Sequence, residues 1–375
     1  MISYLKNPEI QSWEKIFCRP KLEEKKLSQI VEKIWDEVRL KNDNALRELT
    51  KKLDGCEIQD FKVSESRIKQ SKNNIDIELR KSILVAYDNI YRFHNSQIKP
   101  NAKIEISPGV KCWRESRPIN NVGLYIPGGS APLFSTLLML GIPAKIAGVK
   151  NINIVTPPNR DGEIDDVILY VASILEISNI FKIGGAQSIA ALSMGTNTIP
   201  KVDKIFGPGN QYVTKSKFFA SNNGTDIDML SGPSEVFIIA DNSCNPKYVA
   251  ADLLSQAEHG PDSQFILATD DKSVIANVQK EIEEQLLSLP RAETIMKSIK
   301  NSFLVKFENI NDCVKLSNFY APEHLIIASK NFENHIDKIM NAGSVFLGNY
   351  SCESAGDYAS GTNHVLPTNG LSLTR

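Results

Sequence analysis

Hydrophobic and polar positions follow two different rhythms along the chain, and the change falls near residue 121. Before it, residues 27–55 are charged and carry apolar positions at helical spacing, such as Ile30, Ile34 and Val38, and a second helical stretch covers residues 77–98. Residues 103–119 alternate and contain a turn, which predicts a β-hairpin. The first 120 residues are therefore expected to form a helical lead-in and a hairpin.

From residue 121, short apolar runs alternate with helical patterns. The expected strands are residues 121–127, 151–158, 179–185, 202–209, 234–241, 264–270, 303–307, 324–329 and 344–348. Such alternation predicts an α/β fold with parallel sheets covered on both faces, and the number of strands favours two domains. No long linker separates them. A second α/β domain, residues 129–234, is therefore expected to be inserted in a catalytic α/β domain of residues 1–128 and 235–370.

Composition narrows the class of protein. The chain has 375 residues, of which 42% are hydrophobic and 23% charged, and its net charge of -1 gives no basic surplus for nucleic acid. The amino-terminal residues show no signal-peptide pattern, and no apolar run is long enough to span a membrane. The six cysteines are scattered without a C-x-x-C motif, which is typical of reduced thiols. We therefore expect a soluble cytoplasmic protein that binds neither nucleic acid nor a membrane.

Several strands run directly into loops rich in glycine and proline. They are "IPGGSAP", "GGAQ", "FGPGNQ" and "SGPSE". Such loops let the backbone approach a ligand at the carboxyl ends of parallel strands, and the helix N-termini that follow favour phosphate. None matches G-x-G-x-x-G or the P-loop pattern. A tight turn between packed elements explains each loop equally well on its own.

Three polar groups of residues are candidates for chemistry. Gln256 and His259 lie three apart, where a helix is expected to end at Gly260-Pro261, and they form either a solvated last turn or a pair of ligands. Glu323-His324 precede an apolar strand and form either a solvated loop or an acid/base pair. The third group lies in the glycine-rich segment 348–370, which holds Glu353, Asp357 and His364 without clear periodicity.

One conflict remains at this stage. Ligands of open parallel sheets bind past the carboxyl ends of the strands, whereas Glu323-His324 stand before theirs. Either that strand runs antiparallel, or the pair reaches a cleft from another edge.

Together, these segments resemble the histidinol dehydrogenase family. The resemblance runs in order from about residue 20 to residue 370, through "YIPGGSAPLFSTLLML", "GGAQSIAAL", "VDKIFGPGNQYV", "SGPSEVFIIAD", "DLLSQAEHGPDSQ", "APEHL" and "ESAGDYASGTNHVLPT". It implies two Rossmann-like domains, a homodimer, one zinc ion per subunit, and NAD used twice to oxidise L-histidinol through L-histidinal to L-histidine. The pathway would be histidine biosynthesis.

The resemblance also implies roles for single residues. His324 would take the hydroxyl proton as hydride leaves, and Glu323 would activate the water that hydrates the aldehyde. His364 lies near the site in the family pattern, and Cys352 is interpreted as structural rather than as a nucleophile. The implied zinc ligands are Gln256, His259 and Asp357; the NAD contacts are Tyr125, Gln187 and Asn210; the substrate contacts are Ser234, Gln256, His259, His324 and Asp357.

The chain departs from the family pattern at its carboxyl terminus. Family members continue beyond "GTNHVLPTNG" through a helical tail that supplies a fourth zinc ligand, a histidine, and a substrate-contacting glutamate, whereas this sequence ends at Arg375. Weak zinc binding, a loosened dimer and little histidinol oxidation are then expected. Two alternatives stay open: a zinc- or ligand-binding remnant of the same fold, and an oxidoreductase acting on another amino alcohol.

Overall fold

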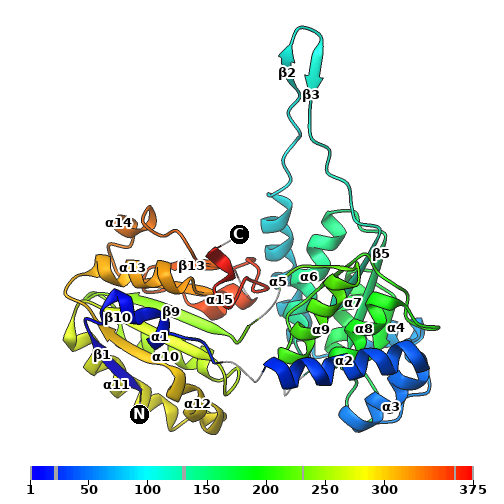
Figure 1. Cartoon of the computed structure of the whole chain (residues 1–375), viewed down its shortest axis with the longest axis horizontal. Coiled ribbons are helices and arrows are strands. Elements are labelled where there is room, and N and C mark those ends of the chain that lie inside the picture. Colours follow the sequence, from blue (N-terminus) through cyan, green and yellow to red (C-terminus); the bar gives the residue numbers. More distant parts are fainter. Residues whose placement is uncertain (1, 21–23, 129–131, 230–231, 359, 374–375) are drawn as a thin grey trace. The chain divides into compact units, whose positions relative to one another are not determined.

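Two compact units make up the chain (Figure 1). The computed structural model describes residues 2–20, 24–128, 132–229, 232–358 and 360–373. Each unit is built on one parallel sheet, which confirms the predicted α/β class with two Rossmann-like parallel-sheet domains and a helical amino-terminal lead-in. Unit 1 consists of Met1–Glu24, Ser231–Gly356 and Leu366–Arg375, and unit 2 consists of Lys25–Leu230 and Asp357–Val365.

The sheet of unit 1 has six strands in the order β1-β11-β10-β9-β12-β13, and every pairing in it is parallel. Its strands are β1 (Ser3–Lys6), β9 (Glu235–Ala240), β10 (Gln264–Thr269), β11 (Phe303–Lys306), β12 (His324–Ala328) and β13 (Ser344–Leu347). The helices between and around them are η1 (Ile10–Ser12), α1 (Trp13–Ile16), α10 (Pro246–Ala257), α11 (Lys272–Leu286), α12 (Ala292–Ser298), η3 (Ile299–Asn301), α13 (Ile310–Tyr320), α14 (Glu333–Ile336) and η4 (Leu371–Leu373); α15 (Glu353–Tyr358) spans the division between the units.

Alternate side chains of the unit 1 strands enter two separate cores. In β9, Val236 and Ile238 pack with α10, α11 and α12, while Phe237 and Ile239 pack on the opposite face with α1 and α13. All four side chains are fully buried. Burial on both faces explains why these strands are continuous apolar runs in the sequence.

The sheet of unit 2 has five strands in the order β6-β5-β4-β7-β8, again with parallel pairings only. Numbered from β4, this is the order 3-2-1-4-5 of a doubly wound sheet. The strands are β4 (Asn121–Tyr125), β5 (Asn151–Thr156), β6 (Asn179–Lys182), β7 (Lys204–Phe206) and β8 (Asp226–Ile227). The helices are α2 (Glu24–Lys41), α3 (Asp43–Leu53), α4 (Glu65–Gln70), η2 (Ser71–Asn74), α5 (Ile77–Asn95), α6 (Phe134–Ile146), α7 (Asp166–Ile174), α8 (Gly185–Met194) and α9 (Gln211–Asn222).

The helical lead-in packs on unit 2, which differs from the expected division of the chain. We expected residues 1–128 to join residues 235–370, with 129–234 inserted; instead Lys25–Leu230 form one body. Trp35 of α2 is 1% exposed, and its Nε1 donates a hydrogen bond of 2.8 Å to Ser216 Oγ of α9. Ile83 and Ile90 of α5 lie in the same core as the β4 side chains. The apolar faces of these helices are thus buried against the second sheet.

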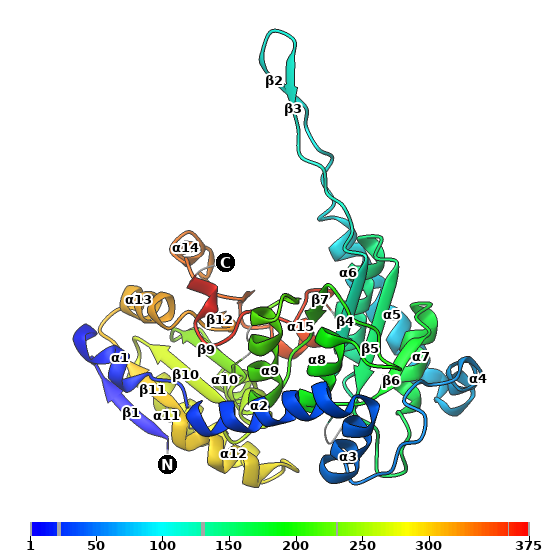
Figure 2. The ribbon, with the colours of Figure 1, turned by 45° about the vertical axis from the view of Figure 1, so that its right-hand side comes forward.

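The expected hairpin is formed by β2 (Ile104–Ser107) and β3 (Val110–Cys112), which pair antiparallel. It stands clear of the rest of unit 2 in both views (Figures 1 and 2). Every residue of the two strands is exposed. The hairpin therefore contributes nothing to the core of its own unit.

The nine strands expected from residue 121 onward are all present, and the sequence reading missed β1 and β8. The helical pattern of residues 27–55 is two helices, because Asn42 has a φ of 57° and its side chain caps α3. His94 of α5 is 8% exposed, and its Nδ1 lies 2.9 Å from the carbonyl oxygen of Ile90. Within the described ranges, no helix is long and apolar enough to cross a membrane.

Candidate active site

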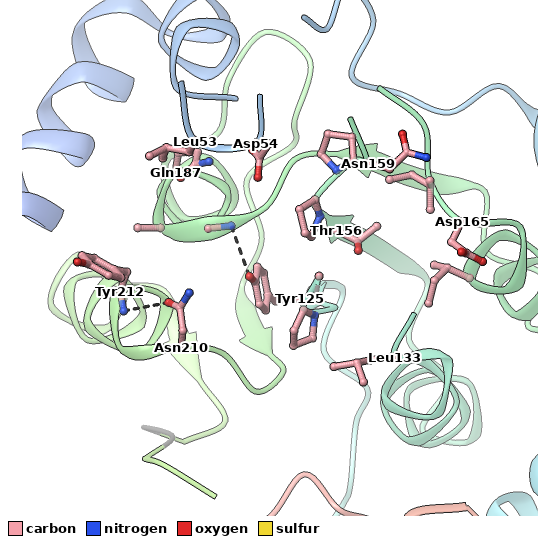
Figure 3. A pocket seen from close by; sticks show the side chains of 18 of the residues that line it. Leu53, Asp54, Tyr125, Leu133, Thr156, Asn159, Asp165, Gln187, Asn210 and Tyr212 are labelled. Atoms are coloured by element: carbon pink, nitrogen blue, oxygen red, sulfur yellow. Dashed lines mark hydrogen bonds between the residues drawn. The ribbon is translucent and has the colours of Figure 1, made fainter. Parts of the chain in front are cut away.

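A cavity of about 690 Å³ opens at the carboxyl edge of the unit 2 sheet (Figure 3). It brings together Tyr125 at the end of β4, Gln187 in the first turn of α8 and Asn210 at the start of α9, the three expected NAD contacts. They meet because the carboxyl ends of parallel strands share one edge, and the following helices begin there. The loop "IPGGSAP" reaches this pocket through Gly128 and Pro132, while residues 129–131 lie outside the described residues.

The polar side chains of Tyr125 and Gln187 in this pocket are buried, which affects their protonation and hydrogen bonding. Burial raises the pKa of Tyr125 to about 12, and its hydroxyl accepts a 3.4 Å hydrogen bond from the Gly185 N–H. Gln187 is 1% exposed, and its Oε1 has no hydrogen-bond partner among the described residues. Asn210 Oδ1 accepts from the first N–H groups of α9, at 3.0 and 3.1 Å, which fixes the side chain at the pocket wall. An unsatisfied buried amide oxygen facing a cavity suits a polar ligand.

A buried ion pair holds the loop that carries Asn210. Lys217 of α9 pairs with Asp228, and both side chains are buried. Lys217 Nζ also donates to the carbonyl oxygen of Gly207 at 3.0 Å, and Asp228 Oδ2 accepts from the Gly207 N–H at 2.7 Å. Gly207 has a φ of 127°, and a Cβ there would lie 2.1 Å from the carbonyl oxygen of Tyr125, so only glycine fits. The sequence analysis did not predict this pair, because Asp228 lies beyond α9, and only the fold brings it to Lys217.

The other candidate residues lie at the amino edge of the unit 1 sheet. His324 is the first residue of β12 and pairs with Val236 of β9 and Ser344 of β13, both in parallel strands. The alternative that this strand runs antiparallel is therefore wrong, and the pair stands at the amino edge. Ser234 immediately precedes β9, so the expected substrate contact and the expected acid/base pair begin neighbouring strands.

The imidazole of His324 lies close to two buried carboxylates. Its Nδ1 is 3.9 Å from Glu323 Oε2 and 3.7 Å from Glu353 Oε1. His324 is 4% exposed, Glu323 7% and Glu353 2%. Carboxylates beside an imidazole orient the ring and stabilise its protonated form. The group can therefore accept a proton and hold it. Glu353 was noticed in the sequence but given no role.

A hydrogen-bond network around Glu235 holds the amino edge of the unit 1 sheet in place. The carboxylate of Glu235, 1% exposed, accepts two hydrogen bonds from Arg19, at 2.5 and 3.1 Å, and one from the Tyr320 hydroxyl at 2.9 Å. The Glu235 N–H donates to Glu323 Oε2 at 3.2 Å. The network links the first residue of β9 to the acid/base pair. In the sequence, only a glutamate at the start of an apolar strand indicates it.

Gln256 and His259 reach the same edge because α10 runs back across the sheet from β9 to the start of β10. The helix ends at Ala257 rather than at Gly260, so buried Gln256 lies in its last turn and exposed His259 lies beyond it. With the amide oriented so that its nitrogen faces the carboxylate, Gln256 donates to both oxygens of Glu353, at 2.9 and 3.0 Å. His259 Nδ1 is 3.4 Å from Ser234 Oγ.

These residues fit a zinc ion by their donor chemistry. The contact with Glu353 holds the Gln256 nitrogen and leaves the amide oxygen available as a donor, and imidazole nitrogen and oxygen donors suit zinc. Asp357, the third expected ligand, lies on α15, which was expected to be a loop, and its Oδ1 is 3.1 Å from His364 Nδ1. His364 Nε2 is 3.1 Å from Thr136 Oγ1. Both ring nitrogens of His364 are thus engaged.

A doubly wound sheet with a pocket at its carboxyl edge, and a separate buried imidazole between carboxylates, are features of a nucleotide-dependent oxidoreductase. The sequence model of the family described as histidinol dehydrogenase matches residues 18–375. The chain is 47% identical over 372 residues to histidinol dehydrogenase of Bacteroides thetaiotaomicron, covering 99% of this chain and 87% of the relative. It is 50% identical over 350 residues to that of Escherichia coli O157:H7, covering 93% and 80%.

A crystal structure of histidinol dehydrogenase from Elizabethkingia anophelis superposes with a TM-score of 0.96 at 51% identity, covering 100% of this chain and 86% of that one. The chain therefore belongs to the histidinol dehydrogenase family of oxidoreductases.

Proposed function

We propose that this protein oxidises L-histidinol through L-histidinal to L-histidine in two NAD-dependent steps, with zinc at the substrate site. Family membership supports the coarser statement, the oxidation of histidinol in histidine biosynthesis. The two steps together consume one water and two NAD, and yield two NADH and three protons. The observation that carries the residue roles is the buried His324 imidazole beside the carboxylates of Glu323 and Glu353.

In the alcohol step, His324 accepts the hydroxyl proton while a hydride leaves the carbinol carbon. The neighbouring carboxylates stabilise the imidazolium that forms, which lowers the barrier to proton transfer. Tyr125, Gln187 and Asn210 would hold NAD, which when bound would supply the hydride acceptor for each step. Zinc bound by Gln256, His259 and Asp357 would supply Lewis acidity and orient the substrate.

In the aldehyde step, Glu323 takes a proton from the water that adds to the aldehyde carbon. The hydrated aldehyde then loses a second hydride to NAD, and the carboxylate forms. Glu323 suits this role because its buried carboxylate lies 3.9 Å from the His324 ring, next to the proposed proton acceptor of the alcohol step. Ser234, next to the start of β9, is proposed to contact the substrate together with His259.

Counting NADH against histidine tests the proposal. We expect about two NADH per histidine, and a ratio of one with accumulating aldehyde would contradict it. His324→Asn should lower the alcohol step, and Glu323→Gln mainly the aldehyde step, by about 10²–10⁴ in rate. His335→Asn is the matched control, since His335 is a buried histidine of the same unit outside this cluster. Near-normal rates in both variants would place the chemistry elsewhere.

Two alternatives give different results in the same assays. An oxidoreductase for another amino alcohol would prefer a substrate without imidazole in a panel at equal concentration. A ligand-binding protein of the same fold would retain zinc after dialysis against a mild chelator and turn over none of the panel. Imidazole-dependent turnover excludes both.

We propose that the protein acts as a homodimer, with the β2–β3 hairpin as a contact. Its side chains Ile104 and Ile106 are 61% and 65% exposed, and Val110 and Trp113 are 47% and 49% exposed, which is unusual for an arm surrounded by water. Light scattering after size-exclusion chromatography should give twice the chain mass. Ile106→Asp should shift the mass toward the monomer, and an unchanged dimer would show that the contact lies elsewhere.

A further inference from the structure

Three carboxylates line the unit 2 pocket, and their surroundings differ. Asp165 caps α7, where its Oδ1 accepts from the Val167 N–H at 2.9 Å. Glu163 lies 3.6 Å from Lys182 Nζ and 3.9 Å from Arg67 Nε. Asp54 differs from both: its Oδ2 is buried and has no hydrogen-bond partner in the part of the chain that the structure describes.

Asp54 enters the pocket from outside the sheet. It is the C-cap residue of α3, where its N–H donates to the carbonyl oxygen of Thr50, and Gly55 with a φ of 75° follows. Figure 3 shows its carboxylate pointing into the pocket, on the side away from Leu133 and in the region of Gln187 and Thr156. The negative charge of Asp54 also contributes to the raised pKa of Tyr125, which faces the same cavity.

The topology shows why a carboxylate is needed here. In doubly wound sheets that bind NAD, an acidic residue after the second strand commonly accepts hydrogen bonds from a ribose. The second strand of this sheet is β5, and the segment after it brings Glu163 and Asp165 to the pocket, but Glu163 faces Lys182 and Arg67, and Asp165 caps α7. Asp54, from the lead-in helices, adds a carboxylate whose Oδ2 has no partner among the described residues.

Burial supports this role. It raises the pKa of Asp54 to about 6, so the group is ionised at neutral pH yet receives little compensation from the protein. An ionised carboxylate with a free oxygen is an acceptor only, and it is satisfied by a ligand that presents hydroxyl groups. A phosphate in the same place would bring two like charges together in a partly buried site.

We infer that Asp54 sets the coenzyme preference: its carboxylate accepts hydrogen bonds from a ribose of NAD and repels the 2′-phosphate of NADP. The inference rests on the proposed function, because it takes the pocket to be the coenzyme site. It adds a residue from α3 to the three contacts contributed by the sheet loops. The lead-in thus becomes part of the binding site.

The test compares NAD with NADP in wild type, Asp54→Asn and Asp54→Ser. Wild type should bind NADH well and NADPH poorly in a fluorescence titration. Both variants should weaken NADH binding by about 10-fold and lower the NAD-to-NADP ratio of kcat/KM by about 10–100-fold, since hydrogen bonds to charged groups have that worth. The value of kcat at saturating NAD should change little. Glu57→Gln is the matched control, because that exposed carboxylate of the same segment pairs with Lys51 and does not line the pocket, and it should keep the wild-type ratio.

The two possible failures are distinguishable. Wild type that binds neither NADH nor NADPH would overturn the proposed function and this inference with it. Wild type that binds NADH, with an unchanged ratio in both Asp54 variants, would overturn the inference alone.

Discussion

The two parallel sheets carry their candidate site residues at opposite edges, one at the carboxyl ends of its strands and the other at the amino ends. In unit 2, Tyr125, Gln187 and Asn210 follow the carboxyl ends of strands, as open α/β sheets usually bind their ligands. In unit 1, Glu323 and His324 stand at the amino ends, beside the start of β9. The carboxyl edge of unit 1 has a cavity of about 630 Å³, lined by residues such as Tyr248 and Phe332, but none of the expected site residues lines it.

The carboxyl edge of one sheet and the amino edge of the other present different backbone groups, so they suit different ligands. The carboxyl edge presents loops and helix N-termini, whose N–H groups favour phosphate. The amino edge presents strand starts and the C-terminal ends of returning helices, which place rigid side chains such as Gln256 and His324 close together. We interpret the first edge as a coenzyme site and the second as a site for metal and proton chemistry.

The largest expected effect is a loss of stability when the buried Lys217–Asp228 ion pair at the unit 2 edge is broken. Lys217→Met leaves the buried carboxylate of Asp228 without its cation, and removing one partner of such a pair costs about 3–5 kcal/mol in the free energy of unfolding. Urea unfolding followed by circular dichroism measures this. The exposed pair Lys51–Glu57 is the control, and Lys51→Met should leave the free energy of unfolding nearly unchanged. Equal losses in the two variants would show that the loop at Gly207 does not depend on the ion pair.

The next effect concerns the unit 1 edge alone. Glu353→Gln removes the carboxylate that contacts both His324 and Gln256, and loss of such a supporting group typically costs about 10–100-fold in metal affinity or activity. Steady-state rates with and without added zinc measure it, and the affinity for NADH should stay at the wild-type value. A variant with normal rates at limiting zinc would remove Glu353 from the account.

A smaller effect is the pH dependence of coenzyme binding. Because burial raises the pKa of Asp54 to about 6, the carboxylate is ionised above pH 6 and protonated below it. The KM for NAD should therefore rise several-fold, up to about tenfold, between pH 7 and pH 5, and Asp54→Asn should flatten this dependence. The comparison with the variant is needed because other ionisable groups lie around this pocket, namely Tyr125, Cys56, Glu163, Asp165 and Lys182.

The raised pKa of Asp54 also affects the stability of the fold, which should change with pH in the direction opposite to coenzyme binding. The folded-state pKa of Asp54 exceeds the ordinary value, so protonation favours the folded state, and the wild type loses stability relative to Asp54→Asn as pH rises to about 6. Thermal unfolding of wild type and Asp54→Asn at pH 4 and pH 7 checks this.

The outcome against both predictions is a KM for NAD that depends on pH equally in wild type and in Asp54→Asn, which would show that another group titrates.

Much of the fold could be predicted from the sequence because long apolar runs identify buried strands. The four residues of β1 and the two of β8 are too short for such a signal, and they lie at sheet edges. The apolar face of a helix shows that it packs, but not on which sheet, so the lead-in was assigned to the wrong partner sheet. Asp54 was overlooked for the same reason, since only the packing of α3 brings it to the pocket.

The candidate site was predictable where a motif carried it, and less so where burial creates the chemistry. Glu323, His324 and Gln256 stood out beside helix and strand ends. The role of Glu235 follows from Arg19, 216 residues away in the sequence, and that of Lys217 from Asp228, 11 residues further along and beyond the end of its helix. No local pattern predicts such a contact.

Separating coenzyme binding from chemistry tests the central comparison most directly. NADH binding can be measured by isothermal titration calorimetry in wild type, His324→Asn and Gln187→Ala, alongside kcat at saturating NAD. We expect His324→Asn to bind NADH as wild type does while kcat falls about 10²–10⁴-fold. Gln187→Ala should weaken NADH binding about 10-fold and keep most of kcat. Loss of NADH binding in His324→Asn, or wild-type binding in Gln187→Ala, would contradict the account that the unit 2 edge binds the coenzyme and the unit 1 edge carries the proton chemistry.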